Sequence, residues 1–129
     1  MNTPNSAAPR VLLVEDEVMV SMMLEDLLER AGYRVITASN LDDALRLAQS
    51  SDMDVAVLDV NLDGELSFPV ADILRARGIA FTFASGYGTD GVSAGYRSEN
   101  MLQKPYDIKT LLNELSRLRA NVERVGGTG

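Results

Sequence analysis

The stretch Asp54-Val55-Ala56-Val57-Leu58-Asp59 decides how this chain folds. Its inner residues are all aliphatic and two of the four are β-branched, which is typical of a strand buried on both faces of a sheet. The carboxylate of Asp59 comes where that strand ends and meets solvent. In an open parallel sheet, ligands bind beyond the carboxyl ends of the strands, so Asp59 is predicted to lie where chemistry can occur.

The composition limits the architecture and the partners. A chain of 129 residues with 46% apolar content forms one domain with one substantial core. Its 19 acidic residues outnumber its 12 basic ones, the net charge is −7, and no basic run occurs, so nucleic-acid binding is not expected. No segment approaches the roughly 20 apolar residues of a membrane span. We therefore expect a soluble cytoplasmic protein without membrane insertion.

The absence of two residue types limits the chemistry. The chain contains no Cys and no His, which excludes thiol catalysis, Ser-His-Asp triads and zinc sites with nitrogen or sulfur ligands. Carboxylates, hydroxyls and Lys remain. A metal site built from oxygen ligands alone suits a hard cation such as Mg²⁺ or Ca²⁺.

Strand-like and helix-like segments alternate along the chain. Strands are predicted at residues 10–14, 34–38, 54–59, 79–84 and 100–103. Helices are predicted up to Gly32, after a cap at Asn40, after Ser67, and from a cap at Asp107 to Val122. The four glycines in residues 86–100 predict a short, irregular or mobile helix there, and residues 60–66 are predicted to form a loop. Flexible tails are expected at residues 1–9 and 123–129, on either side of one domain at 10–122.

Five successive β-α units predict an α/β fold, a doubly wound five-stranded parallel sheet with helices on both faces. The flavodoxin-like strand order 2-1-3-4-5 places the first and third strands side by side. This order brings Glu15 and Asp16 next to Asp59. It also places Ser85 beside them, and Lys104 further along the same edge.

This group of side chains predicts a site for phosphoryl transfer. Two charges 4 Å apart interact by roughly 4 kcal/mol at an effective dielectric of 20, so three crowded carboxylates need a cation and an ammonium. Mg²⁺ typically uses one or two carboxylates plus a phosphate, which matches this set, with Asp59 as the nucleophile and with Mg²⁺ and Lys104 on the developing oxygen charge. Taken alone, Asp16 fits a helix cap as well as it fits a functional residue. Taken alone, Lys104 fits a solvated surface lysine, and Ser85 and Asn61 fit turn residues. Their joint placement at strand ends favours the functional interpretation.

Several motifs, taken in order and spacing, resemble the receiver domains of response regulators in two-component signalling. They are Val11-Leu12-Leu13-Val14-Glu15-Asp16-Glu17, Asp59, Ser85 and Lys104-Pro105-Tyr106. The similarity spans about residues 10–122. The stretch Phe83-Ala84-Ser85-Gly86-Tyr87-Gly88 is also similar to the Phe-Ala-Thr-Gly signature of single-domain receivers common in alphaproteobacteria.

The resemblance implies a phosphoryl acceptor and a metal site. Asp59 would accept a phosphoryl group from a phosphohistidine on a sensor histidine kinase or a histidine phosphotransferase. Asp16, Asp59 and the backbone carbonyl of Asn61 would hold Mg²⁺, and Glu15 would act mainly through ordered water.

The resemblance also implies roles for residues at the other strand ends, and two departures stand out. Lys104 would pair with the phosphoryl group, Ser85 would close over it, and the peptide bond between Lys104 and Pro105 would be cis. Met101 stands where most receivers have a Tyr or Phe that swings inward on activation. Asp63 stands where Pro is usual.

The function predicted from these observations is a stand-alone phosphorylation switch, which is not an enzyme in the ordinary sense. It would signal by binding an unknown downstream protein or by passing the phosphoryl group along a relay. One alternative is a pseudo-receiver that binds a partner without phosphorylation. Another is a haloacid-dehalogenase-like Mg²⁺-dependent phosphatase, which places Asp-x-Asp after its first strand where this chain has Val14-Glu15-Asp16-Glu17.

Overall fold

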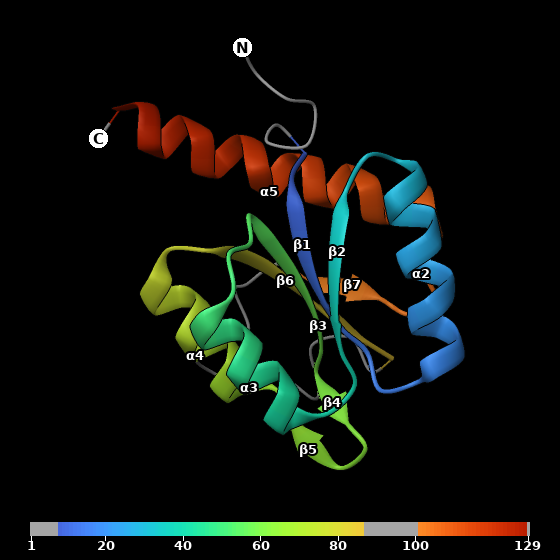
Figure 1. Ribbon diagram of the computed structural model, residues 1–129. Coiled ribbons are helices and arrows are strands. Elements are labelled where there is room, and N and C mark those ends of the chain that lie inside the picture. The colour runs from blue at the N-terminus through green and yellow to red at the C-terminus, as the bar shows by residue number, and fades with distance from the viewer. Residues whose placement is uncertain (1–7, 87–100, 129) are drawn as a thin grey trace.

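The structure is a computed structural model that describes residues 8–86 and 101–128, with side chains of the last helix described up to residue 120. Its centre is a parallel sheet with the strand order β2-β1-β3-β6-β7 (Figure 1). The strands are β1 (Arg10–Val14), β2 (Arg34–Ala38), β3 (Val55–Asp59), β6 (Ala80–Ser85) and β7 (Met101–Gln103). In chain order these five strands are arranged 2-1-3-4-5, which confirms the predicted flavodoxin-like topology.

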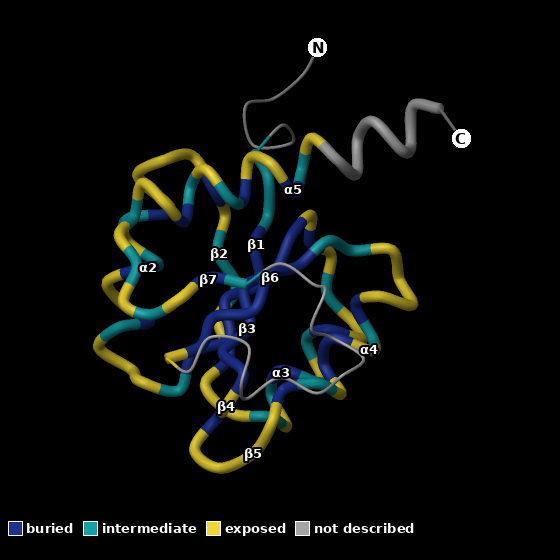
Figure 2. The backbone as a smooth tube through the Cα atoms, turned by 180° about the vertical axis from the view of Figure 1, so that it is seen from behind, coloured by how far each residue is buried: buried dark blue, intermediate teal, exposed yellow. Residues whose placement is uncertain are grey.

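Helices cover both faces of the sheet, and this explains the continuous apolar runs. Helices α2 (Val18–Arg30) and α5 (Ile108–Thr128) lie on one face, and α3 (Leu41–Ser50) and α4 (Phe68–Arg77) on the other (Figure 1). Successive side chains of a strand point to opposite faces, so Leu12 packs in the α3 and α4 core and Leu13 in the α2 and α5 core. Strand β3, at the centre, is accordingly buried along its whole length (Figure 2).

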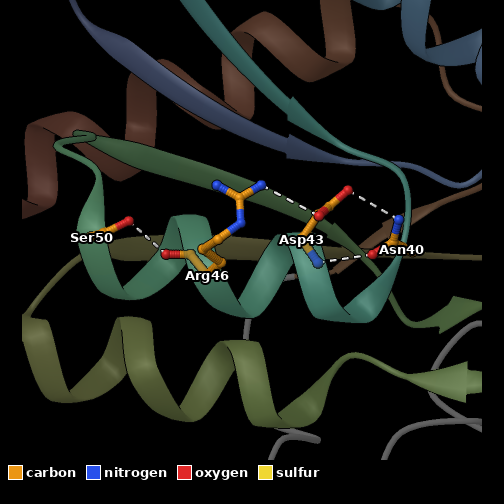
Figure 3. A network of polar contacts seen from close by, with 4 residues as sticks. All are labelled: Asn40, Asp43, Arg46 and Ser50. Carbon is orange, nitrogen blue, oxygen red and sulfur yellow. Dashed lines mark hydrogen bonds and ion pairs between the residues drawn. The ribbon is translucent and has the colours of Figure 1, made fainter.

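Side-chain capping starts helix α3 (Figure 3). Asn40 has an extended backbone, and its Oδ1 accepts a hydrogen bond from the backbone N–H of Asp43 at 2.8 Å. The carboxylate of Asp43 in turn accepts hydrogen bonds from Asn40 Nδ2 at 3.1 Å and from Arg46 at 3.3 Å. At the other end Ser50 Oγ donates to the carbonyl of Arg46 at 2.7 Å. The predicted cap at Asn40 is therefore confirmed.

Helix α5 has the predicted cap and a longer body than predicted. Asp107 Oδ1 accepts from the backbone N–H of Thr110 at 2.8 Å, and this hydrogen bond lowers the pKa of Asp107. The helical backbone continues to Thr128, past the predicted end at Val122. The flexible tail expected at 123–129 stays a prediction. Within the described part of the chain, no helix is both long enough and apolar enough to cross a membrane.

The segment after Asp59 differs from the predicted loop. Residues 60–66 contain an antiparallel hairpin of β4 (Asn61–Leu62) and β5 (Glu65–Leu66). Asp63 and Gly64 form its turn with φ values of 52° and 93°, and positive φ at both central residues is the geometry that an Asp-Gly pair favours. The loop prediction was wrong because this turn signal was not used.

The predicted cap at Ser67 needs correction, and the helix predicted at residues 86–100 lies mostly outside the described residues. Ser67 stands at the start of α4, but its hydroxyl makes no capping hydrogen bond. The physical reason is its backbone, with ψ at 7° instead of the extended value that aims a capping side chain at the helix. The irregular helix predicted at residues 86–100 lies, apart from Gly86, outside the described residues.

Candidate functional site

The carboxyl end of β3 places Asp59 at the centre of one edge of the sheet. Strand β1 pairs with β3 so that Val14 lies opposite Leu58. The residues that follow these two strands therefore emerge side by side, which brings Glu15 and Asp16 to Asp59. One carboxylate oxygen from each of the three lies within 4.8 Å of the others. Glu15 and Asp59 are 1% and 3% exposed, whereas Asp16 is half-buried.

A lysine from the far side of the sheet reaches the two buried carboxylates. Lys104 follows β7, and its backbone N–H donates to the carbonyl of Ser85 at the end of β6 at 2.8 Å. Its Nζ lies 3.0 Å from Asp59 Oδ1 and 3.3 Å from Glu15 Oε1. The peptide bond between Lys104 and Pro105 is cis, as the resemblance implied.

Burial and charge shift the protonation equilibria of this group. Burial first, and then the adjacent Glu15 carboxylate, raise the pKa of Asp59 from 3.8 to about 8, against the opposing charge of Lys104. Burial alone would lower the pKa of Lys104, but the carboxylates of Asp59 and Glu15 outweigh it and raise that pKa. The nearby Tyr106 has its pKa raised to about 12, mainly by burial and then by the charge of Asp59. Lys104 therefore only partly offsets the negative charge of the carboxylates around it.

The oxygen atoms of the group fit a hard divalent cation. Glu15 has partners for both oxygens, since Oε1 meets Lys104 and Oε2 accepts from the backbone N–H of Glu17 at 3.0 Å. Asp59 Oδ2 is buried and accepts no hydrogen bond from the described residues. A buried carboxylate oxygen without a donor is costly, and a cation removes that cost. Asp16 and Asp59 could therefore bind the cation directly.

The site opens into a cleft of about 310 Å³ at this edge of the sheet. Five of the residues singled out in the sequence line it, namely Asp16, Asp59, Asn61, Ser85 and Lys104. The sixth, Glu15, is buried beneath Lys104. The cleft is open to solvent at Asn61 and closed at its floor by the buried Asp59 and Ser85. A small anionic group could enter it and reach the Asp59 carboxylate.

Comparison with known proteins identifies the family. The sequence model of the response regulator receiver domain matches residues 11–116. The chain belongs to this family.

A curated relative of this receiver domain is the uncharacterized transcriptional regulatory protein YbdJ of Bacillus subtilis (strain 168). It is 33% identical over 123 residues, which are 92% of this chain and 53% of YbdJ. The aerobic respiration control protein ArcA of Escherichia coli (strain K12) is 24% identical over 124 residues, 92% of this chain and 51% of ArcA. The receiver domain thus spans about half the length of these curated relatives.

Two solved structures are similar over nearly their whole length. The solution structure of SdrG from Sphingomonas melonis Fr1 is 40% identical, with a TM-score of 0.75, and the match covers 87% of this chain and 97% of SdrG. TrrA from Thermotoga maritima, solved in complex with Mg(2+)-BeF, is 23% identical with a TM-score of 0.75, over 85% of this chain and 98% of TrrA. The likeness to TrrA shows the fold alone.

Six residues that the sequence interpretation did not assign to the site also line the cleft of the receiver domain, and three of them matter for its charge and shape. They are Glu17, Asp63 and Leu66. Glu17 stands at the N-cap position of α2, but its side chain makes no capping hydrogen bond. Asp63 and Leu66 reach the cleft because residues 61–66 fold into the hairpin. The Asp-Gly pair was the sequence signal that could have predicted this.

Proposed function

We propose that this receiver domain is a stand-alone response regulator that accepts a phosphoryl group on Asp59. The donor would be a phosphohistidine of a sensor histidine kinase or of a histidine phosphotransferase. The observation that carries the proposal is the buried Asp59 carboxylate, 3.0 Å from Lys104 Nζ and within 4.8 Å of two further carboxylates. The phosphorylated protein would act in the cytoplasm, by binding an unidentified downstream protein or by passing the group along a relay.

The proposed transfer uses the side chains of the cleft in distinct roles. An oxygen of Asp59 forms a bond to phosphorus while the bond from phosphorus to the imidazole nitrogen breaks, and the imidazole leaves with the electron pair. Lys104 would neutralise charge on the phosphoryl oxygens, and the Ser85 hydroxyl at the end of β6 would donate a hydrogen bond to one of them. Asp59 must be ionised to attack, so its raised pKa makes its reactivity depend on nearby positive charge.

Mg²⁺ is the cation that we assign to the acidic group. Asp16, Asp59 and the backbone carbonyl of Asn61 would bind it, and Glu15 would act through ordered water. When bound, Mg²⁺ supplies positive charge that favours ionised carboxylates and offsets the charge of the phosphoryl oxygens. The unpartnered Asp59 Oδ2 supports this assignment, and so does the complex of the related TrrA with Mg(2+)-BeF.

The proposal of a stand-alone protein of the Phe-Ala-Thr-Gly subgroup has its own support. SdrG, at 40% identity, matches over 97% of its solved chain and so has the extent of a single receiver domain. Phe83, Ala84, Ser85 and Gly86 preserve the pattern of that signature, with Ser in place of Thr. The longer transcriptional regulators, of which this chain spans about half, represent the other arrangement.

The two alternative functions predict different chemistry. A pseudo-receiver needs no reactive acceptor. In this protein, however, Lys104 lies 3.0 Å from the Asp59 carboxylate, and the cleft leads to that carboxylate. A phosphatase would release phosphate continuously from a substrate. The proposed switch instead takes up one phosphoryl group per chain and holds it.

Incubation with acetyl phosphate and Mg²⁺, followed by intact-protein mass spectrometry, separates these functions. We expect the mass of one added phosphoryl group, lost in Asp59→Asn. The matched control is Asp54→Asn, the same substitution just before the start of the same strand, where the Asp54 carboxylate accepts a hydrogen bond from the backbone N–H of Arg10 at 2.7 Å. A wild-type protein that gains no mass would contradict the proposal, and sustained phosphate release would support the phosphatase.

A further inference from the structure

The hairpin after the acceptor strand is a fixed part of the cleft wall. The backbone N–H of Gly64 donates to Asn61 Oδ1 at 2.6 Å and locks the turn. Leu62, 2% exposed, anchors the hairpin in the core beneath α4. At its base, the N–H of Ser67 donates to the carbonyl of Val60 at 2.9 Å. The hairpin therefore holds Asp63, at the tip of the turn, in a defined place on the wall of the cleft.

The charges that line the cleft are strongly unbalanced. Among the described residues that line it, four are acidic and Lys104 alone is basic; the acidic ones are Asp16, Glu17, Asp59 and Asp63. Lys104 is engaged by Asp59 at 3.0 Å and by Glu15 at 3.3 Å. Within residues 8–86 and 101–120, no ion pair reaches Asp63. Clefts lined by one sign of charge focus the field on whatever enters them, so Asp63 adds an unneutralised negative charge on the way to the acceptor.

Asp63 differs in position from the three carboxylates of the acidic group. Oxygens of Glu15, Asp16 and Asp59 lie within 4.8 Å of one another, and Asp63 is outside that set. It is also exposed to solvent, whereas Asp59 is buried. Its influence on a reacting phosphoryl group is therefore through space and partly screened. Such a charge changes the approach of a donor without taking part in bond making.

We propose that Asp63 is a specificity-determining residue, which makes the site discriminate between phosphodonors by their charge. Small dianionic donors such as acyl phosphates are disfavoured relative to donors whose phosphoryl group is carried on a protonated nitrogen. In both cases Asp59 forms the bond to phosphorus, and the bond to the leaving group breaks with its electron pair. This inference rests on the proposed function, because it assumes that Asp59 is the acceptor.

The test compares two small donors of different charge. Acetyl phosphate is a dianion near neutral pH, whereas the protonated amine of phosphoramidate leaves it a monoanion. Initial rates of phosphorylation with each donor are measured by intact-protein mass at saturating Mg²⁺ and low ionic strength. The proteins are the wild type, Asp63→Asn and the matched control Glu65→Gln, which removes the same charge from a residue of the same hairpin that does not line the cleft. Asn tolerates the positive φ of position 63, so the turn is preserved.

We expect Asp63→Asn to raise the ratio of the acetyl phosphate rate to the phosphoramidate rate by about two- to threefold, as removal of one screened charge predicts. Glu65→Gln should change the ratio less. The difference should shrink near 1 M salt, where the Debye length falls to about 3 Å.

The outcomes separate this inference from the function on which it rests. An unchanged ratio in Asp63→Asn, or an equal change in Glu65→Gln, would overturn the inference while phosphorylation itself persists. A wild-type protein that neither donor phosphorylates would overturn the proposed function, and the inference with it. Equal Tm values for wild type and Asp63→Asn accompany the expected result.

Discussion

Replacement of Asp59, the proposed acceptor, should stabilise the cation-free protein. The Asp59→Asn substitution keeps the size of the side chain and removes its charge, at a position that is 3% exposed. Lys104 retains its ion pair with Glu15 at 3.3 Å, so the ammonium is not left alone. The variant therefore loses the cost of a buried, crowded carboxylate and loses little else.

The raised pKa sets the size and the sign of this effect. Burial, followed by Glu15, raises the pKa of Asp59 from 3.8 in its ordinary state to about 8. Between these values the native state binds a proton that the unfolded chain has released, so the free energy of unfolding falls as pH rises from about 4 to 8. At roughly 1.4 kcal/mol per pH unit, the upper limit at pH 7 is about 4 kcal/mol. Relaxation and water penetration reduce it, and we expect a gain of about 1–3 kcal/mol for Asp59→Asn.

Urea melts in EDTA at pH 5, 6, 7 and 8 measure this gain. The stability of the wild type should fall across the series by more than that of Asp59→Asn, so that the advantage of the variant grows with pH. Thermal melts should show a Tm higher by about 3–5 °C for each kcal/mol. The free energy of unfolding of Asp54→Asn, a substitution just before the start of β3, should depend on pH as that of the wild type does. Parallel curves for wild type and Asp59→Asn, or a less stable variant at pH 7, would refute the reasoning.

Three further predictions concern the cation, a helix cap and the hairpin. Millimolar Mg²⁺ should raise the Tm of the wild type more than that of Asp59→Asn, because a cation that binds only the native state stabilises it and Asp59 would be a ligand. Thermal melts in Mg²⁺ and in EDTA measure this, and an equal rise in Tm for the two proteins would contradict it. Asn40→Ala should lower the free energy of unfolding by about 1 kcal/mol in urea melts, because the N–H of Asp43 loses its 2.8 Å cap, whereas Asn40→Asp should retain most of it. Leu62→Ala should cost about 2–5 kcal/mol because Leu62 is 2% exposed in the core. Leu66→Ala, at a position 46% exposed, should cost about 0.5 kcal/mol or less, and similar losses for the two would show that Leu62 does not anchor the hairpin.

The local sequence predicted the fold because the central strands are apolar along most of their length. A sheet covered on both faces needs strands that are apolar at every position, and β3 is buried along all of Val55–Asp59. The caps at Asn40 and Asp107 were also predictable from local sequence, since each side chain accepts a hydrogen bond from the backbone N–H three residues further on. Once the strand order was assigned, the convergence of residues at the ends of β1, β3, β6 and β7 followed from the parallel arrangement.

Some local features nevertheless depended on surroundings that the sequence does not show. Ser67 has the residue type of a cap, but its backbone conformation at the end of the hairpin turns the hydroxyl into a fully buried position without a partner among the described residues. Leu62 and Leu66 have the same chemistry, yet one is buried and the other exposed, because pairing in the hairpin sends them to different environments.

The sequence by itself thus determined the five strands of the main sheet, the helices that cover it, their order, and which acidic, hydroxyl and ammonium groups stand at the strand ends, but not the β4–β5 hairpin. Only the tertiary structure decided how those groups act on one another. The 3.0 Å contact of Lys104 with Asp59 joins residues from strands that are not neighbours, and the elevated pKa of Asp59 depends on how deeply the whole fold buries it. Periodicity and capping are properties of neighbouring residues along the chain, whereas distance, burial and electrostatic coupling between remote residues exist only after the chain has folded.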